Sequence, residues 1–498
     1  MPLEKHMKQK TKNYKKLFFN KWFFFLLIFS ISLRLLWFNV PLEDDEGVML
    51  YLSDSWLKGK NPYSYADTKT PISYMNYFPP LILKNHSFFV FRLYGCFIFF
   101  LSLFFLLLYL YEIRKNHKEA LFGGFIYSIL MHIPLLQGFL NKPGTFFNLY
   151  FVLSLYFLTK YFTSDNKKYF YLSSLFWAIA LLSNSLNMVY IGIFNLILLF
   201  QKKKIKHIIQ YSSISFAIGI VSLGYFYVRF KINLIYLAYV SIKSFYLIYS
   251  KYFAVFHNKG FPILYFEAII LMIGLILIGL KLYKKLNLTS KIALLLSMFA
   301  LIYQTITPSF GHYLVSLFPI IVIFSSNLFN KIKQNINLKL FISLLLLFTF
   351  LTSIKYYPEH NIKNSVKFHE FSSYSEQQAI VSFLKNNLNE NESFYYWGWN
   401  PGLYWLTNKN YPLTAFSLHM GCGTPFDYLY EDILNNTLKE GEIYCLLIVK
   451  ENLSTDCNDF NLLIKNKYKV SFKTKIKNFE FYDLEFVNRS KQYTINKP

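Results

Sequence analysis

Residues 87–111 read SFFVFRLYGCFIFFLSLFFLLLYLY, an apolar run whose one charged residue is Arg92. An α-helix rises about 1.5 Å per residue, so a run of this length can cross the roughly 30 Å hydrocarbon core of a membrane. Runs of similar character recur along most of the chain. The sequence therefore predicts many membrane-spanning helices in an integral membrane protein.

The composition points the same way. Of the 498 residues, 54% are hydrophobic, 21% are aromatic and only 16% are charged, against about 25% charged residues in a typical soluble domain. This mix excludes a disordered chain, a collagen-like fibre and a small disulfide-stabilised domain. The cysteines make no zinc or haem pattern. Cys96 lies in an apolar run, whereas Cys422, Cys445 and Cys457 lie near the C-terminus, where an exported location would allow one disulfide.

The formal net charge of +25 comes largely from short basic clusters between the apolar runs. The clusters lie at 1–21, 112–119, 160–168, 202–206, 281–291 and 331–339. Such clusters mark the cytoplasmic side of a membrane protein under the positive-inside rule. The charge is therefore explained by topology, and no nucleic-acid partner is expected.

Reading spans between these clusters predicts about eleven transmembrane helices. The predicted spans are 17–39, 87–111, 120–136, 146–163, 169–184, 187–200, 208–228, 262–280, 291–307, 312–329 and 340–355. One helix over 169–200 would be too long for the membrane, so a hairpin at 183–187 fits better. A span at 232–250 would place the later Lys clusters outside, so this stretch is predicted to be interfacial or packed against the bundle.

These spans divide the chain into three predicted regions. Residues 1–16 form a cytoplasmic basic tail, and 17–355 form a transmembrane domain with an outer catalytic loop at 40–86. Residues 356–498 form an exported part, because an odd number of spans places them outside. The first span lacks a small-residue cleavage site, which indicates a retained anchor in the inner or plasma membrane.

The exported part alternates helical and strand-like segments. An amphipathic stretch at 376–388 precedes strand-like runs at 393–396 and 443–449, which predicts a small α/β domain. It contains no Gly-rich phosphate loop, so no motif there indicates nucleotide binding.

Six carboxylates cluster just outside the first span. They are Glu43, Asp44, Asp45, Glu46, Asp54 and Asp67. The first four can simply cap an amphipathic stretch at 47–57, because carboxylates suit the positive end of a helix. A carboxylate there can also act as a general base at the outer membrane surface. The two roles are compatible, since a helix N-terminus also fixes the direction of a carboxylate.

Cations lie on the same predicted face of the membrane. Arg34, Arg92 and Arg229 lie in or beside the outward ends of spans, and Lys69 lies in the outer loop. An ionisable residue inside a span indicates function by default, and Arg is a good ligand for phosphate. The simpler alternatives are snorkelling to lipid headgroups for the arginines and solvation for the lysine. Acids and cations on one face together suggest a phosphate-bearing substrate.

The outer loop also carries a family resemblance. The stretches 41–51 (PLEDDEGVMLY), 57–63 (LKGKNPY) and 67–71 (DTKTP) resemble the first outer loop of polyprenyl-phosphate-sugar-dependent GT-C glycosyltransferases. This group includes the protein O-mannosyltransferases and the lipid A aminoarabinose transferases. Arg34, Arg92 with the following Leu, 311–319 (GHYLVSLFP) and 397–407 (WGWNPGLYWLT) are further similarities. The resemblance implies a multi-pass GT-C fold with a small exported α/β domain.

The resemblance also implies a reaction, which is inverting transfer of a sugar from a polyprenyl-phosphate donor to a lipid, glycan or protein acceptor outside the cytoplasm. Asp45 matches the catalytic aspartate of the group, and Glu46 is its neighbour. A base is needed because an acceptor hydroxyl loses its proton as it attacks the anomeric carbon. The further matched positions are Lys69, Arg92 and, more weakly, Arg34 as ligands of the departing phosphate. His312 and Tyr313 would lie at the outer mouth of the bundle as substrate-binding candidates, where a purely structural histidine is the alternative. Arg229 is a further substrate-binding candidate from its position near an outward span end.

The sequence departs from the group at two places. Lys142 lies where many relatives have an acid, and the turn at 183–187 lacks the basic residue often found there. No residue pattern indicates a cofactor, and a divalent metal is compatible with the resemblance but is not indicated. The oligosaccharyltransferase branch is disfavoured, because the motif that begins at Trp397 contains no acid.

Two other functional classes are alternatives to a glycosyltransferase. A transporter is disfavoured because the chain has no internal repeat and no matching pair of broken spans. A non-catalytic scaffold with an exported binding domain is the other alternative. The basic and aromatic stretch at 229–260 has two interpretations, an interfacial anchor in the membrane lipids or a mobile cover over the outer site.

Overall fold

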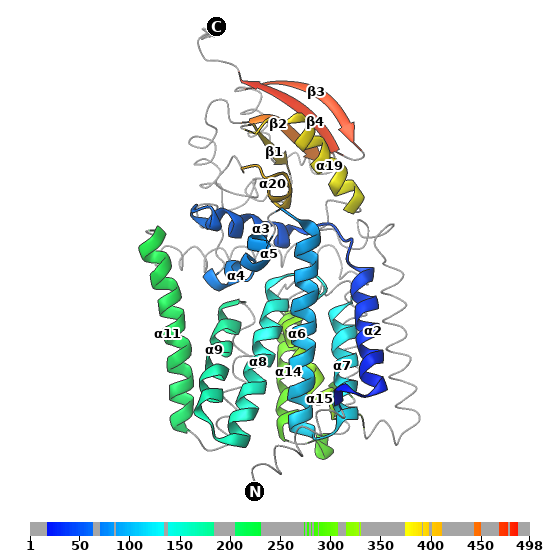
Figure 1. Ribbon diagram of the computed structural model, residues 1–498, viewed down its shortest axis with the longest axis vertical. Coiled ribbons are helices and arrows are strands. Elements are labelled where there is room, and N and C mark those ends of the chain that lie inside the picture. The colour runs from blue at the N-terminus through cyan, green and yellow to red at the C-terminus, as the bar shows by residue number, and fades with distance from the viewer. Residues whose placement is uncertain are drawn as a thin grey trace. The chain divides into compact units, whose positions relative to one another are not determined.

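The computed structural model describes most of the predicted spans and part of the C-terminal region (Figure 1). The described residues are 17–62, 70–83, 86–133, 138–183, 205–230, parts of 273–306, parts of 315–329, 374–390, 392–397, 401–410, 443–449, 468–476 and 479–486. They fall into two compact units. The helical unit comprises Met1–Asn39, Lys69–Pro80 and Phe89–Pro358, and the mixed unit comprises Val40–Thr68, Leu81–Phe88 and Glu359–Pro498.

Long helices run side by side in the helical unit (Figure 1). They are α2 (Lys21–Leu36), α6 (Phe88–Arg114), α7 (His117–Met131), α8 (Pro143–Ser164), α9 (Lys167–Ser183), α11 (Ile205–Phe230), α14 (Leu288–Ile306) and α15 (Phe318–Ser326). Shorter helices are α4 (Pro71–Met75), α5 (Phe78–Leu83) and η3 (Tyr283–Lys285). Each lies in or beside a predicted span or in the outer loop. The predicted spans 187–200 and 340–355 lie outside the described residues, and only isolated residues of 262–280 are described.

The turns between helices use polar residues that the sequence places there. Asn116 caps the start of α7 by accepting a hydrogen bond from the Lys118 N–H at 3.0 Å. Lys115 and Asp165 adopt left-handed backbone conformations, with φ of 54° and 52°, between α6 and α7 and between α8 and α9. Two predicted basic clusters, 112–119 and 160–168, therefore coincide with tight turns at helix ends.

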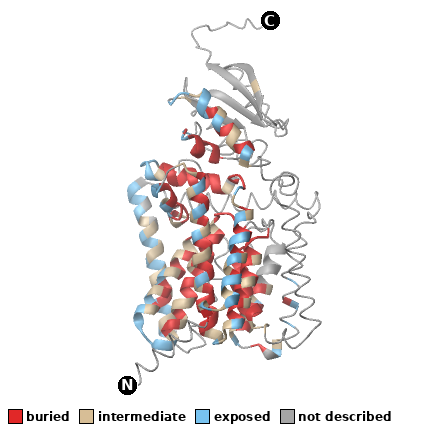
Figure 2. Ribbon diagram, turned by 45° about the vertical axis from the view of Figure 1, so that its right-hand side comes forward, coloured by how far each residue is buried: buried red, intermediate tan, exposed pale blue. Residues whose placement is uncertain are grey.

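Buried residues are concentrated in the helices of the helical unit (Figure 2), and apolar side chains among them form its core. α7 and α6 approach closely at Gly123, where an added Cβ would lie 2.5 Å from a methyl carbon of Leu110 and would force that side chain to shift. Such small residues let transmembrane helices pack tightly without a hydrophobic driving force between them.

Two buried ionic groups tie helix ends together. Glu112 on α6 forms ion pairs with Lys160 on α8 and, at 2.6 Å, with Lys115. Arg114 donates hydrogen bonds to the Ser290 hydroxyl at 2.5 Å and to the Ile323 carbonyl at 2.6 Å, which joins α6 to α14 and α15. These contacts fix the C-terminal end of α6 relative to its neighbours.

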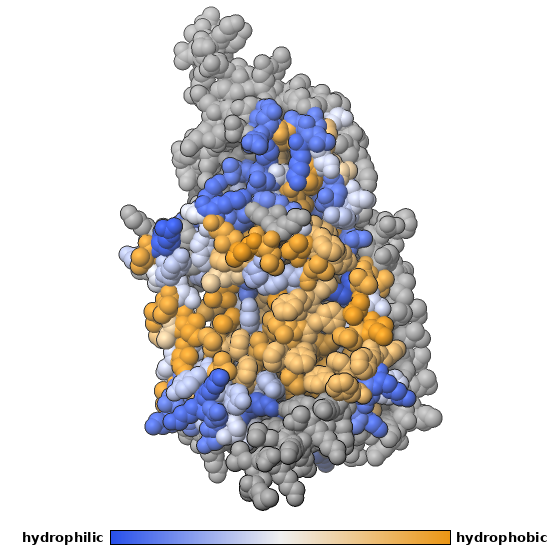
Figure 3. All heavy atoms as spheres, in the orientation of Figure 1, coloured by the Kyte–Doolittle hydropathy of each residue, from blue (hydrophilic) through white to orange (hydrophobic). Residues whose placement is uncertain are grey.

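Several helices turn large apolar side chains outward. Examples are Ile28 and Leu35 on α2 and Phe216 and Val228 on α11, which are more than half exposed. Figure 3 shows the corresponding apolar surface over the helices. Among the described residues, α6 and the Lys206–Arg229 part of α11 are long and apolar enough to cross a membrane. An apolar surface this extensive is expected to face lipid, since soluble monomers rarely expose such patches.

The mixed unit contains helices and one sheet. Its helices include α3 (Asp44–Leu57), α19 (Tyr374–Asn387) and α20 (Gly402–Thr407). Its strands are β1 (Ser393–Trp397), β2 (Ile443–Val449), β3 (Tyr468–Ile476) and β4 (Phe479–Phe486), in the order β1-β2-β4-β3. β1 and β2 are parallel, with Phe394 opposite Cys445, whereas β4 is antiparallel to both of its neighbours.

The mixed unit joins segments that are far apart in the sequence. Residues 40–68 and 81–88, which sequence analysis grouped with the transmembrane helices, cluster with the C-terminal residues. The cause is side-chain packing of α3 against α20, which no local pattern in either segment indicates. The carboxylate cluster after the first span is therefore held by residues that lie more than 300 positions later.

Candidate active site

The carboxylates at 43–46 form the start of α3. Glu43 is the N-cap, and its carboxylate accepts a hydrogen bond from the Asp45 N–H at 3.1 Å. The Glu43 N–H in turn donates to the Glu46 carboxylate at 3.4 Å, which completes a capping box. The helix begins at Asp44, three residues earlier than the predicted stretch 47–57, because this capping box supplies partners for its first N–H groups.

The carboxylate residues at the start of α3 differ in their exposure to solvent. Glu43 and Glu46 are buried, and Glu46 has 0% of its surface exposed. Asp45 is half-buried and lies in the first turn between them. Glu46 is therefore engaged in capping, whereas Asp45 has a partly exposed carboxylate that can accept a proton or a hydrogen bond from a ligand.

The N-terminal end of α3 is fixed by α19. The Gln377 side-chain amide accepts a hydrogen bond from the Leu42 N–H at 2.9 Å and donates one to the Leu42 carbonyl at 3.3 Å. Further along the helix, Tyr51 contacts Tyr404 of α20 edge-on, with ring centroids 6.2 Å apart. Tyr404 stacks on Phe394 of β1 at 4.3 Å. Sequence analysis did not identify Gln377 or Tyr404 as site residues.

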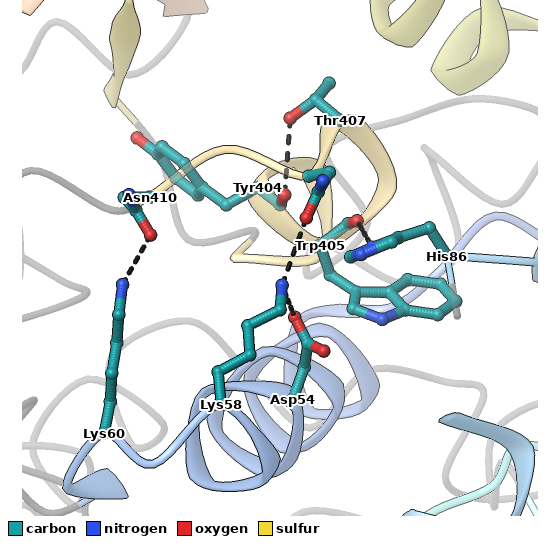
Figure 4. Close-up of polar contacts among 9 residues, drawn as sticks. Asp54, Lys58, Lys60, His86, Tyr404, Trp405, Thr407 and Asn410 are labelled. Carbon is teal, nitrogen blue, oxygen red and sulfur yellow. Dashed lines mark hydrogen bonds and ion pairs between the residues drawn. The ribbon is translucent and has the colours of Figure 1, made fainter. Parts of the chain in front are cut away.

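The C-terminal end of α3 is joined to α20 by polar pairs (Figure 4). Lys58 forms an ion pair with Asp54 at 2.6 Å and donates to the Asn408 side chain at 3.1 Å. Lys60 donates to the Asn410 side chain at 2.6 Å. Burial lowers the pKa of Lys60, and the neighbouring Lys58 charge lowers it further. These two Lys–Asn pairs connect the segment after α3 with the segment after α20.

His86 adds another contact to α20. Its Nδ1 donates a hydrogen bond to the Trp405 carbonyl, and the two rings lie 5.8 Å apart (Figure 4). Burial lowers the pKa of the His86 imidazole below its ordinary value of 6.5. Burial therefore favours the neutral imidazole in the folded protein. The stretch 397–407 contains α20, and sequence analysis did not predict that it contacts His86.

Arg34, a predicted phosphate ligand, lies buried in the helical unit. Its guanidinium donates to the Asn141 side-chain oxygen at 3.4 Å and lies 5.6 Å from the centroid of the Phe99 ring. Asn141 occupies a notch on α6, because its Oδ1 lies only 1.7 Å from where a Cβ on Gly95 would be. The Asn141 amide also donates to the Phe91 carbonyl at 2.9 Å.

Arg92, the second predicted phosphate ligand described by the structure, lies on the same part of α6. It is buried, and its guanidinium lies 5.6 Å from the centroid of the Phe91 ring. Phe91 is the residue whose carbonyl binds Asn141, which in turn binds Arg34. Asn141 thus joins Arg34 to the backbone of α6 at Phe91, the residue before Arg92. Their burial among protein groups differs from the exposed ends expected of arginines that snorkel to headgroups.

Of the remaining predicted site residues, the structure describes Arg229. Arg229 is exposed in the last turn of α11, as expected of an anchor at the membrane surface. Lys69, His312 and Tyr313 lie outside the described residues. Lys142, which departs from the group pattern, is buried at the N-cap of α8.

His132 is a buried ionisable residue that sequence analysis missed. Its Nδ1 donates to the Ser128 carbonyl at 2.6 Å, and its ring meets Phe99 edge-on at 5.0 Å. Phe99 therefore contacts both His132 and Arg34. The available signal was its place inside the predicted span 120–136, where an ionisable side chain is unusual.

The parts of the chain that the structure describes contain no group of three or more His, Cys, Asp or Glu residues arranged to hold a metal ion. Among the predicted site residues, the structure describes the half-buried Asp45 in the mixed unit and the buried Arg34 and Arg92 in the helical unit. A carboxylate can take up a proton, and guanidinium groups stabilise phosphate charge.

Comparison with known proteins gives one family match and several similar structures. The family described as dolichyl-phosphate-mannose-protein mannosyltransferase matches residues 80–225. No curated protein sequence matches the chain. The structure of ArnT from Cupriavidus metallidurans bound to undecaprenyl phosphate is similar, with a TM-score of 0.55 and 11% sequence identity, over 93% of this chain and 98% of that one.

A further similar structure is the Archaeoglobus fulgidus oligosaccharyltransferase in complex with Zn and sulfate. It has a TM-score of 0.44 and 11% identity over 92% of this chain and 72% of that one. The likeness to ArnT establishes a shared fold along nearly the whole chain. The predicted resemblance to GT-C glycosyltransferases that use polyprenyl-phosphate donors is confirmed.

Proposed function

We propose that this chain, whose fold is that of GT-C membrane glycosyltransferases, transfers a sugar with inversion from a polyprenyl-phosphate donor to an acceptor outside the cytoplasm. The observation that carries the proposal is the partly exposed carboxylate of Asp45, fixed in the first turn of α3 beside buried Glu43 and Glu46. The family match and the likeness to a structure that holds undecaprenyl phosphate support a lipid-phosphate donor.

The proposed reaction is a single displacement at the anomeric carbon. The acceptor hydroxyl oxygen forms a bond to that carbon, and the bond from the carbon to the phosphate oxygen breaks. The lipid phosphate leaves with the electron pair, and Asp45 takes the hydroxyl proton as general base. Arg92, Lys69 and Arg34 are the proposed ligands that stabilise the charge on the departing phosphate.

The proposed arrangement in the membrane follows from the charge distribution. The N-terminal tail is cytoplasmic, about eleven helices cross the inner or plasma membrane, and 356–498 are exported. The acceptor is a lipid, a glycan or a protein. Arg34 and Arg92 are both buried in the helical unit, and guanidinium groups bind phosphate oxygens well, which supports an anion-binding role for them.

The test supplies membranes that contain the chain with a panel of polyprenyl-phosphate-linked radiolabelled sugars and identifies the labelled acceptor. We expect Asp45→Asn to lower transfer by about 10²–10⁴-fold, because an amide of similar shape cannot accept a proton. Asp165→Asn is the matched control, since Asp165 is exposed in a turn at the end of α8 and Asn tolerates its left-handed backbone. Normal transfer by Asp45→Asn would refute the assignment and favour a transporter or scaffold.

A further inference from the structure

Gln377 forms an unusual contact with the segment that leads into α3. Its side chain is completely buried, and both functions of its amide bind the backbone of one residue, Leu42. The carbonyl oxygen accepts from the Leu42 N–H at 2.9 Å, and the amide nitrogen donates to the Leu42 carbonyl at 3.3 Å. A side chain that pairs with both backbone groups fixes the position and the rotation of that peptide segment, as a neighbouring strand would.

The position of Leu42 makes this contact consequential. Leu42 directly precedes Glu43, the N-cap of α3, and Asp45 follows two residues later. Glu43 binds the Asp45 N–H, and Glu46 binds the Glu43 N–H. Leu42 is therefore connected through a short, hydrogen-bonded segment to the carboxylate of Asp45, so a shift of the Leu42 backbone would be transmitted to that carboxylate.

The helix that carries Gln377 is itself well anchored. Ile380 and Leu384 of α19 are buried, and Tyr374 stacks on Phe88 with ring centroids 4.2 Å apart. An anchored helix can impose a position on a partner, whereas a loosely held one would follow it. The neighbouring Gln378 is half-buried overall, and its buried amide nitrogen has no hydrogen-bond partner among the described residues, which makes it a matched control.

We propose that Gln377 is a positioning residue that sets the direction of the Asp45 carboxylate. The inference rests on the proposed function and deepens it, because it makes α19, in the C-terminal part of the chain, a component of the catalytic apparatus. Displacement of a catalytic group by about 1 Å can cost about 10²-fold in rate. Loss of both Gln377 hydrogen bonds releases the segment before α3, so the expected loss falls on turnover and leaves donor binding intact.

The first test does not depend on sugar transfer. Asp45→Cys places a thiol at the position of interest, and mass spectrometry follows its alkylation by a maleimide in the purified full chain. We expect Gln377→Leu to change the alkylation rate several-fold, because the start of α3 is no longer held, and Gln378→Leu to leave it unchanged. Equal rates in all three backgrounds would overturn the proposal.

The second test measures transfer with the polyprenyl-phosphate sugar that the donor panel identifies. Gln377→Leu is expected to lower kcat about tenfold to hundredfold with an unchanged donor KM, and Gln377→Glu to lower it less, because a carboxylate still accepts from the Leu42 N–H. A folded Gln377→Leu protein with normal kcat would contradict the inference. Where Gln377→Leu does not fold, Gln377→Glu decides by the same two readouts.

The two proposals fail in different ways. If Asp45→Asn transfers sugar normally, the proposed role of Asp45 is wrong, and the alkylation comparison still decides whether Gln377 fixes the start of α3. If Asp45→Asn is inactive but Gln377→Leu alters neither alkylation nor kcat, Gln377 has only a structural role and the positioning inference is wrong.

Discussion

Gly95→Ala is expected to destabilise the helical unit, although alanine is normally the better helix residue. The Cβ of an alanine at position 95 would lie 1.7 Å from the Asn141 side-chain oxygen, 2.4 Å from its Cγ and 2.5 Å from its nitrogen. The Asn141 side chain must therefore leave the notch on α6. It then loses its hydrogen bonds to the Phe91 carbonyl and to Arg34.

The size of the effect follows from these contacts. A neutral hydrogen bond contributes about 0.5–1.5 kcal/mol, and one to a charged group contributes about 1.5–3 kcal/mol. The Arg34 contact is long at 3.4 Å, so the lower end of the range applies to it. The two losses sum to about 2–3 kcal/mol, and the gain in helix propensity offsets about 0.5–1 kcal/mol. The net loss in the free energy of unfolding is therefore about 1–2.5 kcal/mol.

A double-mutant cycle tests the cause of this loss. Unfolding of the purified chain in detergent micelles is followed by SDS titration for Gly95→Ala, Asn141→Ala and the double variant. In the Asn141→Ala background the obstructing atoms are gone, so Gly95→Ala should be neutral or slightly stabilising. Gly219→Ala on α11 is the control, because no atom lies within 4 Å of its added Cβ. An equal loss from Gly95→Ala in both backgrounds would refute the reasoning.

Two further expectations concern pH and topology. Burial lowers the pKa of His86 below 6.5, so the unfolded chain binds a proton at this residue more readily than the native chain does. The contribution of neutral His86 to the free energy of unfolding is therefore fully present above pH 6.5 and is lost as the pH falls toward the native pKa. The thermal unfolding temperature should therefore decrease as the pH is lowered from about 7.5 to about 5.5, and His86→Asn should make this decrease smaller. An identical pH response in the two proteins would contradict the role of His86. For topology, an impermeant thiol reagent on intact cells should label Ser382→Cys but not Asn166→Cys in a background without native cysteines, since both positions are exposed; the opposite labelling would place 356–498 inside.

Much of the fold can be predicted from local patterns in the sequence. Residues 87–111 predict the helix that α6 forms at Phe88–Arg114, because one apolar run of sufficient length leaves few alternatives in a membrane. The basic clusters at 112–119 and 160–168 coincide with turns, because a polar segment between two apolar runs ends one helix and begins the next. Asp45 is identifiable as a candidate from the carboxylate cluster and the family resemblance, and the capping box at Glu43 and Glu46 follows from the identity and spacing of these residues.

The partners of these residues were decided by the tertiary structure. The Gln377 amide reaches Leu42 across 335 positions, and Asn141 reaches Arg34 across 107. A hydrogen bond between distant segments leaves no periodicity or composition signal, because each polar residue alone resembles an ordinary helix or loop residue. Hydrophobic periodicity thus determined where the chain forms helices, whereas packing determined which single polar side chains fix the candidate base and the buried arginines.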